Sequence, residues 1–274
     1  MTFSKFATRI LLAWAALAVI QIIVGMLVPL KAPQGGNLFA WVLLTNLLVV
    51  AVLAFVATRS GWRGWGLALS LFAIPFGIAL VNLIEGSVFL TNSGLDWSML
   101  LLYEFVVYAM AAPVWTLIFR SIEPPFELTL PRPFGAHLWR FVVCDVAYLF
   151  LYFLAGTIIL PFVRAYYATQ TLPATTTIIS LQLLLRGPVF TFLCLLLLRM
   201  LGMRRGVGAL AVGATFTVLS GIAPLLIPNP VFPDAVRWVH FCEVTSSNFV
   251  FGAFVGWIWG RSQVAPPSAA RKAA

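Results

Sequence analysis

Two ionisable residues lie three positions apart at the beginning of the last apolar segment, VRWVHFCEVTSSNFVFGAFVGWIWG (residues 236–260). His240, Glu243 and Ser247 follow one another at spacings of three and four, so a helix places them on one face, with Asn248 beside it. Three interpretations fit this face: interhelical hydrogen bonds, a site for a proton or cation, and a catalytic acid/base pair. Because the other faces are apolar, we expect the polar face to point into the protein.

A single arginine lies deep in another apolar segment. Arg186 is about eleven residues from its outer end, or roughly 17 Å at the rise of an α-helix. A charge at that depth needs a partner. Glu104 and Glu243, each about 10 Å below the outer boundary, are predicted to be its partners and to form a coupled pair of acids. The Gly-Pro dipeptide after Arg186 predicts a kink with an unsatisfied backbone carbonyl, and a purely structural salt bridge is the alternative.

Four further polar residues are weaker candidates. Asn82 and Glu85 lie at the outer end of the third apolar segment, where water explains them unless they join the same cluster. Asn46 aligns with Arg186 when the two halves of the chain are compared. Asp145 is expected near the cytoplasmic end of its segment, as a structural partner of Arg140. The candidate binding, proton or ion site therefore comprises Asn46, Asn82, Glu85, Glu104, Arg186, His240, Glu243, Ser247 and Asn248.

Sequence signatures of metal, nucleotide and hydrolase sites are missing from the chain. Its three cysteines, Cys144, Cys194 and Cys242, are widely spaced and fit neither a disulfide framework nor a metal-ligand pattern. No H-E-x-x-H, G-x-S-x-G, phosphate-loop or EF-hand motif occurs. We therefore expect no cofactor, no metal site and no catalytic residue that a motif would assign. This result favours a protein that is not an enzyme, but the sequence alone does not exclude an enzyme.

The helices that must position these residues are predicted to cross a membrane. The chain is 62% hydrophobic and 9% charged, whereas about a quarter of the residues in a soluble domain are charged. A bilayer crossing takes about 20 apolar residues. Eight segments qualify: 10–30, which we interpret as an uncleaved first helix, 38–58, 65–85, 97–119, 141–162, 175–198, 207–227 and 236–259. The predicted fold class is an all-α polytopic membrane protein with eight transmembrane helices.

The basic residues predict how the chain is oriented in the membrane. Thirteen of the seventeen Lys and Arg residues lie at the termini or in the even-numbered connections, which face one side. Lys31, Arg164 and Arg237 lie on the other side. Short cytoplasmic loops retain basic residues, so both termini are predicted to be cytoplasmic, in a multi-pass protein of the inner (plasma) membrane. This placement explains the net charge of +9 without nucleic acid, and the lipid bilayer is the expected partner.

The two halves of the chain share a pattern of residues. Arg-Gly-Trp-Gly at 63–66 aligns with Arg-Gly-Val-Gly at 205–208, and the fourth and eighth segments each contain a Trp, a Glu, a second Trp and an Arg in that order. This pattern predicts two parallel four-helix repeats, at residues 1–122 and 138–262. Residues 123–137 would form a cytoplasmic linker, and residues 263–274 a disordered basic tail.

Three functions remain open at this point. Transport or permeation of a small solute or ion through a polar cluster in the outer half of the bundle is the first. The alternatives are a membrane-embedded enzyme acting on a lipid or lipid-linked substrate, with His240 and Glu243 as its acid/base pair, and an assembly or scaffold subunit without a site. The sequence specifies neither the substrate nor the oligomeric state.

Overall fold

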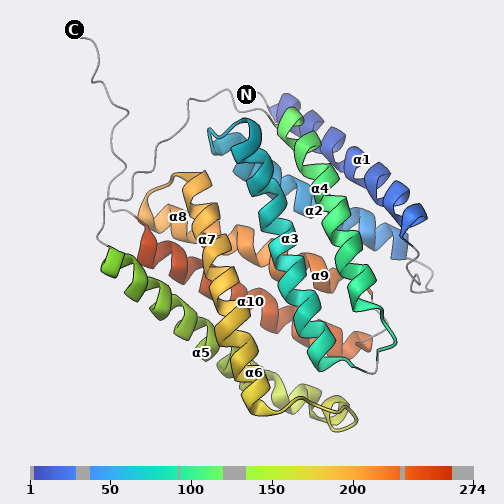
Figure 1. Ribbon diagram of the computed structural model, residues 1–274, viewed down its shortest axis with the longest axis vertical. Coiled ribbons are helices and arrows are strands. Elements are labelled where there is room, and N and C mark those ends of the chain that lie inside the picture. The colour runs from blue at the N-terminus through green and yellow to red at the C-terminus, as the bar shows by residue number, and fades with distance from the viewer. Residues whose placement is uncertain (1–2, 29–37, 92, 120–133, 229–231, 261–274) are drawn as a thin grey trace.

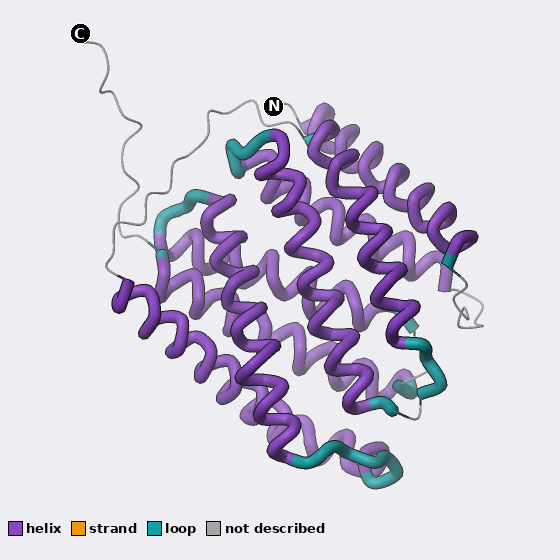
Figure 2. The backbone as a smooth tube through the Cα atoms, in the orientation of Figure 1, coloured by secondary structure: helices purple, strands orange, loops and turns teal. Residues whose placement is uncertain are grey.

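All regular structure in the part of the chain described by the computed structural model is helical (Figures 1 and 2). The described residues are 3–28, 38–91, 93–119, 134–228 and 232–260. The helices of the first half are α1 (Phe3–Leu27), α2 (Leu38–Arg59), α3 (Gly64–Phe89) and α4 (Trp97–Ile118). Those of the second half are α5 (Phe134–Tyr167), α6 (Thr175–Leu181), α7 (Gly187–Leu201), α8 (Arg205–Thr217), α9 (Ala223–Leu226) and α10 (Asp234–Trp259). Two π-helical turns, η1 (Gln182–Arg186) and η2 (Val218–Ile222), join α6 to α7 and α8 to α9.

Eight helical segments are long and apolar enough to cross a membrane. The prediction of an eight-span polytopic membrane protein is therefore confirmed, and most boundaries agree within a few residues. The first and fifth spans are the largest exceptions, because their helices begin at Phe3 and Phe134 rather than near residues 10 and 141. The predicted linker and tail fall largely on residues 120–133 and 261–274, which lie outside the described residues.

The helices of each half pair in a corresponding order. In the first half α1 packs against α2 and α4, and α4 also packs against α3. In the second half α5 packs against α7 and α10, and α10 also packs against α8. Between the halves, α2 and α3 contact α7 and η2, and α2 also contacts α9 (Figure 1). This correspondence is compatible with a duplicated unit, and the duplication stays a prediction.

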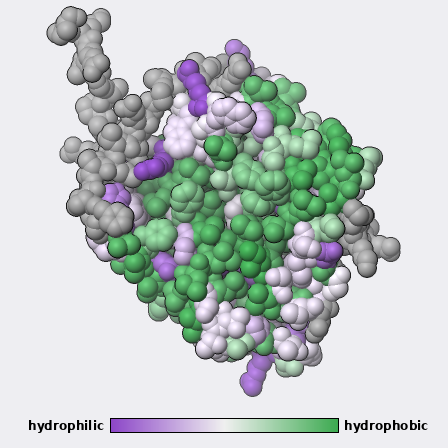
Figure 3. Space-filling view, viewed as in Figure 1, coloured by the Kyte–Doolittle hydropathy of each residue, from purple (hydrophilic) through white to green (hydrophobic). Residues whose placement is uncertain are grey.

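The outer surface is apolar along the length of the helices. Large exposed hydrophobic side chains include Ile22, Phe150, Phe162 and Leu184. Figure 3 shows a broad hydrophobic region across one face, with hydrophilic residues toward its ends. A surface of this kind fits hydrocarbon rather than water, because soluble monomers rarely expose large contiguous apolar patches.

Both π-helical turns end immediately before an Xaa-Pro step. In η1 the backbone N–H of Gly187 donates to the carbonyl of Gln182, and Pro188 follows. In η2 the N–H of Ala223 donates to the carbonyl of Val218, and Pro224 follows. Proline has no N–H, and its ring collides with the carbonyl four residues earlier. Widening the turn accommodates this collision while the chain continues across the membrane.

The backbones of α8 and α10 approach closely along a row of small residues. A Cβ atom added at Gly256 would lie 2.6 Å from Cα of Ala209, and one added at Gly252 would lie 3.0 Å from Cα of Gly213. Helices in lipid associate through such small-residue contacts, which allow extensive van der Waals packing. This packing fixes α10, and with it the polar face that begins at His240.

Candidate functional site

Arg186, the last residue of η1, forms an ion pair with Glu85 of α3. Its other terminal nitrogen, Nη2, donates to the Asn82 side-chain oxygen at 3.2 Å. Gln182, on the same π-helical turn, donates through Nε2 to the second carboxylate oxygen of Glu85 at 3.1 Å. Glu85 is thereby held by two residues from the other half, and the contact joins α3 to η1.

A second set of contacts joins the end of α5 to the beginning of α10. Nδ1 of His240 lies 2.6 Å from the Glu243 carboxylate, and Nε2 of His240 lies 2.8 Å from the Tyr167 hydroxyl. The neutral tautomer that satisfies both contacts donates from Nδ1 to the carboxylate and accepts from Tyr167 at Nε2. Glu243 thus fixes the orientation of the imidazole, and the other ring nitrogen is directed at a hydroxyl group.

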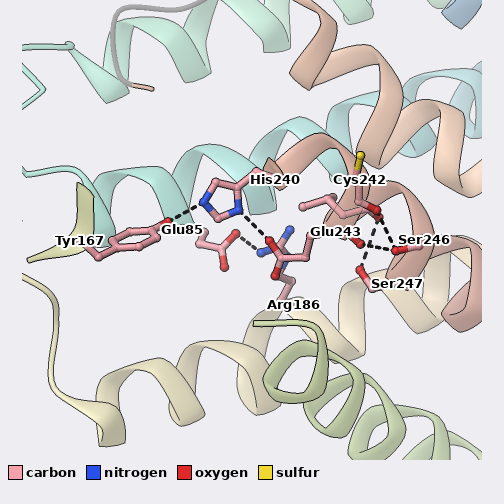
Figure 4. A network of polar contacts seen from close by, with 9 residues as sticks. Glu85, Tyr167, Arg186, His240, Cys242, Glu243, Ser246 and Ser247 are labelled. Atoms are coloured by element: carbon pink, nitrogen blue, oxygen red, sulfur yellow. Dashed lines mark hydrogen bonds and ion pairs between the residues drawn. The ribbon is translucent and has the colours of Figure 1, made fainter. Parts of the chain in front are cut away.

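The two sets of contacts lie next to each other (Figure 4). Arg186 interacts electrostatically with Glu243 as well as with Glu85. The side chains of Arg186, Glu85, His240 and Glu243 are 8%, 17%, 13% and 12% exposed, so all four are largely buried inside the protein. We call these four residues, with Asn82, Tyr167 and Gln182, the polar cluster.

The polar cluster has hydrogen-bonding capacity left over. Nε of Arg186 and Oε1 of Gln182 are buried without a hydrogen-bond partner among the described residues. The guanidinium also lies 5.2 Å from the Phe190 ring centroid and 5.9 Å from that of Tyr148, so aromatic faces supply part of its contact. Unsatisfied buried polar atoms cost free energy, so the cluster retains positions at which a further polar group would be stabilised.

Two residues farther along α10 contact the end of α8 and the second π-helical turn. Asn248 donates to the Ser220 hydroxyl of η2 at 2.9 Å, and Thr217 of α8 donates to the backbone carbonyl of Thr245 at 2.5 Å. Within the described part of the chain, Ser247 bonds only to its own helix, at the carbonyl of Val244. The polar face of α10 therefore points inward, as predicted, but Asn248 belongs to the packing of η2 rather than to the polar cluster.

The predicted partners of Arg186 were only partly right. Glu243 interacts with Arg186 electrostatically, but the carboxylate that forms the ion pair is that of Glu85 and not that of Glu104, because α3 and not α4 packs against α7 and η2 of the second half. Among the described residues, no hydrogen bond or ion pair joins Glu104 to Arg186 or Glu243. Asn46 bonds the side chain of Gln21 in α1, so it is also separate from the polar cluster.

The position expected for Asp145 also needs correction. Because α5 begins at Phe134, Asp145 lies about three turns from the start of the helix rather than about one and a half. Its Oδ1 atom is buried without a hydrogen-bond partner among the described residues. It lies against the backbone of Gly187, 2.0 Å from the place where a Cβ would be. The expected pairing with Arg140 therefore does not account for this oxygen.

Sequence reasoning missed two members of the polar cluster. Gln182 is four residues before Arg186, a spacing that places both on one helical face, so a signal for it was present. Tyr167 lies at the end of a different helix, 73 positions from His240, and no local spacing connects the two. Asn82 and Glu85 had been attributed first to a hydrated helix end, and their contact with Arg186 replaces that interpretation.

Comparisons with protein-family models, curated proteins and solved structures found no match to this chain. The geometry of the polar cluster is therefore the main guide to function.

Proposed function

We propose that the protein transports a small solute or ion across the membrane, and that the polar cluster is the site where the solute, or a proton that moves with it, is bound. The observation that carries the proposal is the adjacency of two pairs, Arg186–Glu85 and His240–Glu243, inside a bundle of apolar helices. Ionisable residues are costly in a bilayer, and where they occur they commonly form ion pathways and proton relays.

The position of the polar cluster supports the same proposal. Glu85 and Asn82 come from the first half and the other members from the second, so the cluster lies where the halves meet. In transporters built from repeats, substrate and coupling ions bind at such interfaces, often beside interrupted helices. The π-helical turn η1 interrupts the helix at Arg186, and π-bulges are frequent at functional sites.

Uptake by reconstituted protein tests the proposal. The purified chain in lipid vesicles would be assayed with a panel of radiolabelled solutes covering inorganic cations, inorganic anions, amino acids, carboxylates and sugars. We expect uptake of at least one class above protein-free vesicles, a loss of that uptake in Glu243→Gln, and retention of it in Ser246→Ala. Ser246 is exposed, and within the described part of the chain it bonds only to its own helix, so it is a matched control. Absence of uptake across the panel, or full activity of E243Q, would contradict the proposal.

A membrane-embedded enzyme is the second candidate, and the Tyr167–His240–Glu243 arrangement favours it. A carboxylate that orients an imidazole toward a hydroxyl is the arrangement by which a histidine removes a proton from a nucleophile. In this function His240 would be the general base for a lipid or lipid-linked substrate. Conversion of a lipid extract by the purified chain, abolished in His240→Gln, would favour the enzyme, whereas an unchanged lipid profile would argue against it.

A further inference from the structure

We infer that Asp145 is a second proton-carrying site, next to the polar cluster at the junction of η1 and α7. This inference rests on the proposed transport function and adds a second site to it. The juxtaposition that carries it is the contact between the Asp145 carboxyl group and the backbone of the η1–α7 junction.

The Oδ1 atom of Asp145 lies against the backbone at the η1–α7 junction. A Cβ added at Gly187 would collide with this oxygen. Among the described residues Oδ1 has no hydrogen-bond partner and less than 1 Å² of accessible surface. A carboxylate oxygen that is removed from solvent and lacks a donor is costly to keep charged, and a proton on the carboxyl group removes that charge.

The same geometry argues against a metal cation. Among the described residues, no group of three or more His, Cys, Asp or Glu side chains could hold a metal ion. Oδ1 also lies so close to the Gly187 backbone that its inner side is filled. A proton needs no additional ligands, whereas Na⁺ or K⁺ would require several oxygens around an open position. We therefore assign a proton rather than a metal ion.

A row of polar side chains on α5 connects Asp145 to the polar cluster. Tyr148 and Tyr152 follow Asp145 at spacings of three and four, so the three lie on one face. Arg186 lies over the Tyr148 ring, and both tyrosines interact electrostatically with Glu243. Ionisable groups near Asp145 include Arg140, Cys144 and Tyr148 on its own helix, Arg186 on η1, Cys194 of α7 beside Cys144, and Glu243 of α10 beyond Tyr148.

Infrared spectroscopy of the chain in lipid bilayers detects a protonated carboxyl group whether or not the protein transports anything. At neutral pH we expect the wild-type spectrum to contain carbonyl absorption of a protonated carboxylic acid that is lost in Asp145→Asn. The matched control is Asp96→Asn. Asp96 is exposed at the N-terminus of α4, where Ser98 and the Met99 N–H hold its carboxylate, so D96N should leave this band unchanged.

Glycine variants test the same site without removing the acid. Gly187→Ala places a methyl group against Oδ1 of Asp145, and we expect it to shift or abolish the band. Gly156→Ala, on α5 with nothing within 4 Å of the added Cβ, should not. G187A keeps the inference testable if D145N fails to fold.

The outcomes separate this inference from the proposed function. The inference would be overturned if D145N lost only the absorption of an ionised carboxylate. It would also be overturned if neither D145N nor G187A altered the carbonyl band of the protonated carboxylic acid. A band whose position depends on Na⁺ would overturn the choice of a proton. A band lost in D145N, with no uptake of any solute by the wild type, would support the proton site and contradict transport.

Discussion

The ion pair between Arg186 and Glu85 is predicted to stabilise the bundle as a unit. Both side chains are largely buried, so replacing either one alone leaves a buried group without its partner, at a cost of about 3–5 kcal/mol. We expect Arg186→Met and Glu85→Gln each to lower the unfolding temperature in detergent. The double variant should recover much of the lost stability, since neither Arg186 nor Glu85 is then left charged without the other.

A double-mutant cycle measures this coupling. Arg164→Met, at an exposed position near the end of α5, is the control for removal of an arginine and should have little effect. Losses that simply add in R186M/E85Q would show that the two residues stabilise the protein independently.

Residue spacing predicted contacts within one helix but failed between helices. His240 and Glu243 were assigned to one face from their spacing of three, and they are in contact. For Arg186 the acid of the first half was wrongly predicted to be Glu104, because depth was estimated from sequence while the packing order of the helices was unknown. Glu104 and Glu85 are both acids of the first half, and only the packing of α3 against α7 and η2 decides between them.

Close packing of α8 and α10 gives a prediction at the scale of whole helices. Gly256→Ala adds a methyl group 2.6 Å from Cα of Ala209, so the two backbones must separate. We expect a loss of about 1–3 kcal/mol, typical of overpacking, measured by unfolding in detergent. Gly25→Ala in α1, with nothing within 4 Å of its added Cβ, should be neutral or stabilising. Equal stability of the two variants would show that the close approach is unimportant.

The N-terminus of α4 should lose stability on acidification. The Ser98 hydroxyl and the Met99 N–H donate to Asp96 and lower the pKa of its carboxyl below the ordinary 3.8. A lowered pKa means that the capping contribution is present above 3.8 and is lost as pH falls through the folded-state value. Asp96→Asn keeps a capping side chain that does not titrate. We expect local hydrogen exchange at α4 to rise in acid for the wild type but not for D96N. An identical acid response would contradict this assignment.

The helices were predicted correctly where hydropathy determines the structure, and incorrectly where backbone geometry determines it. The eight spans were predicted because long apolar runs have few alternatives in a membrane protein. A break at Pro188 was predicted from proline chemistry, but its form as a π-helical turn, and the equivalent turn before Pro224, were not. Both depend on how the helix widens while packed against its neighbours, which a single sequence does not encode locally.

Topology at the scale of the whole molecule is testable independently of function. We predict that reporters fused after Arg63, Gly135 and Arg205 are cytoplasmic, and that reporters near Gly36, Ser93 and Asn229 are external, because thirteen basic residues lie on the first side. One reproducible inversion would contradict the orientation.

The repeat hypothesis predicts that α1 to α4 superpose on the second half in the same order and direction, with α2 on the helix containing Arg186. A superposition in which α2 fails to overlie that helix would show the alignment to be chance.

We propose that the polar cluster exchanges a proton while the solute crosses the membrane. Proton movement into reconstituted vesicles, followed with an internal pH-sensitive dye as candidate solutes are added outside, tests this claim most directly. We predict a solute-dependent pH change with the wild type and with Ser246→Ala, and its loss in Glu243→Gln and His240→Gln. A wild-type signal no greater than that of protein-free vesicles, or an undiminished signal in both cluster variants, would contradict the claim.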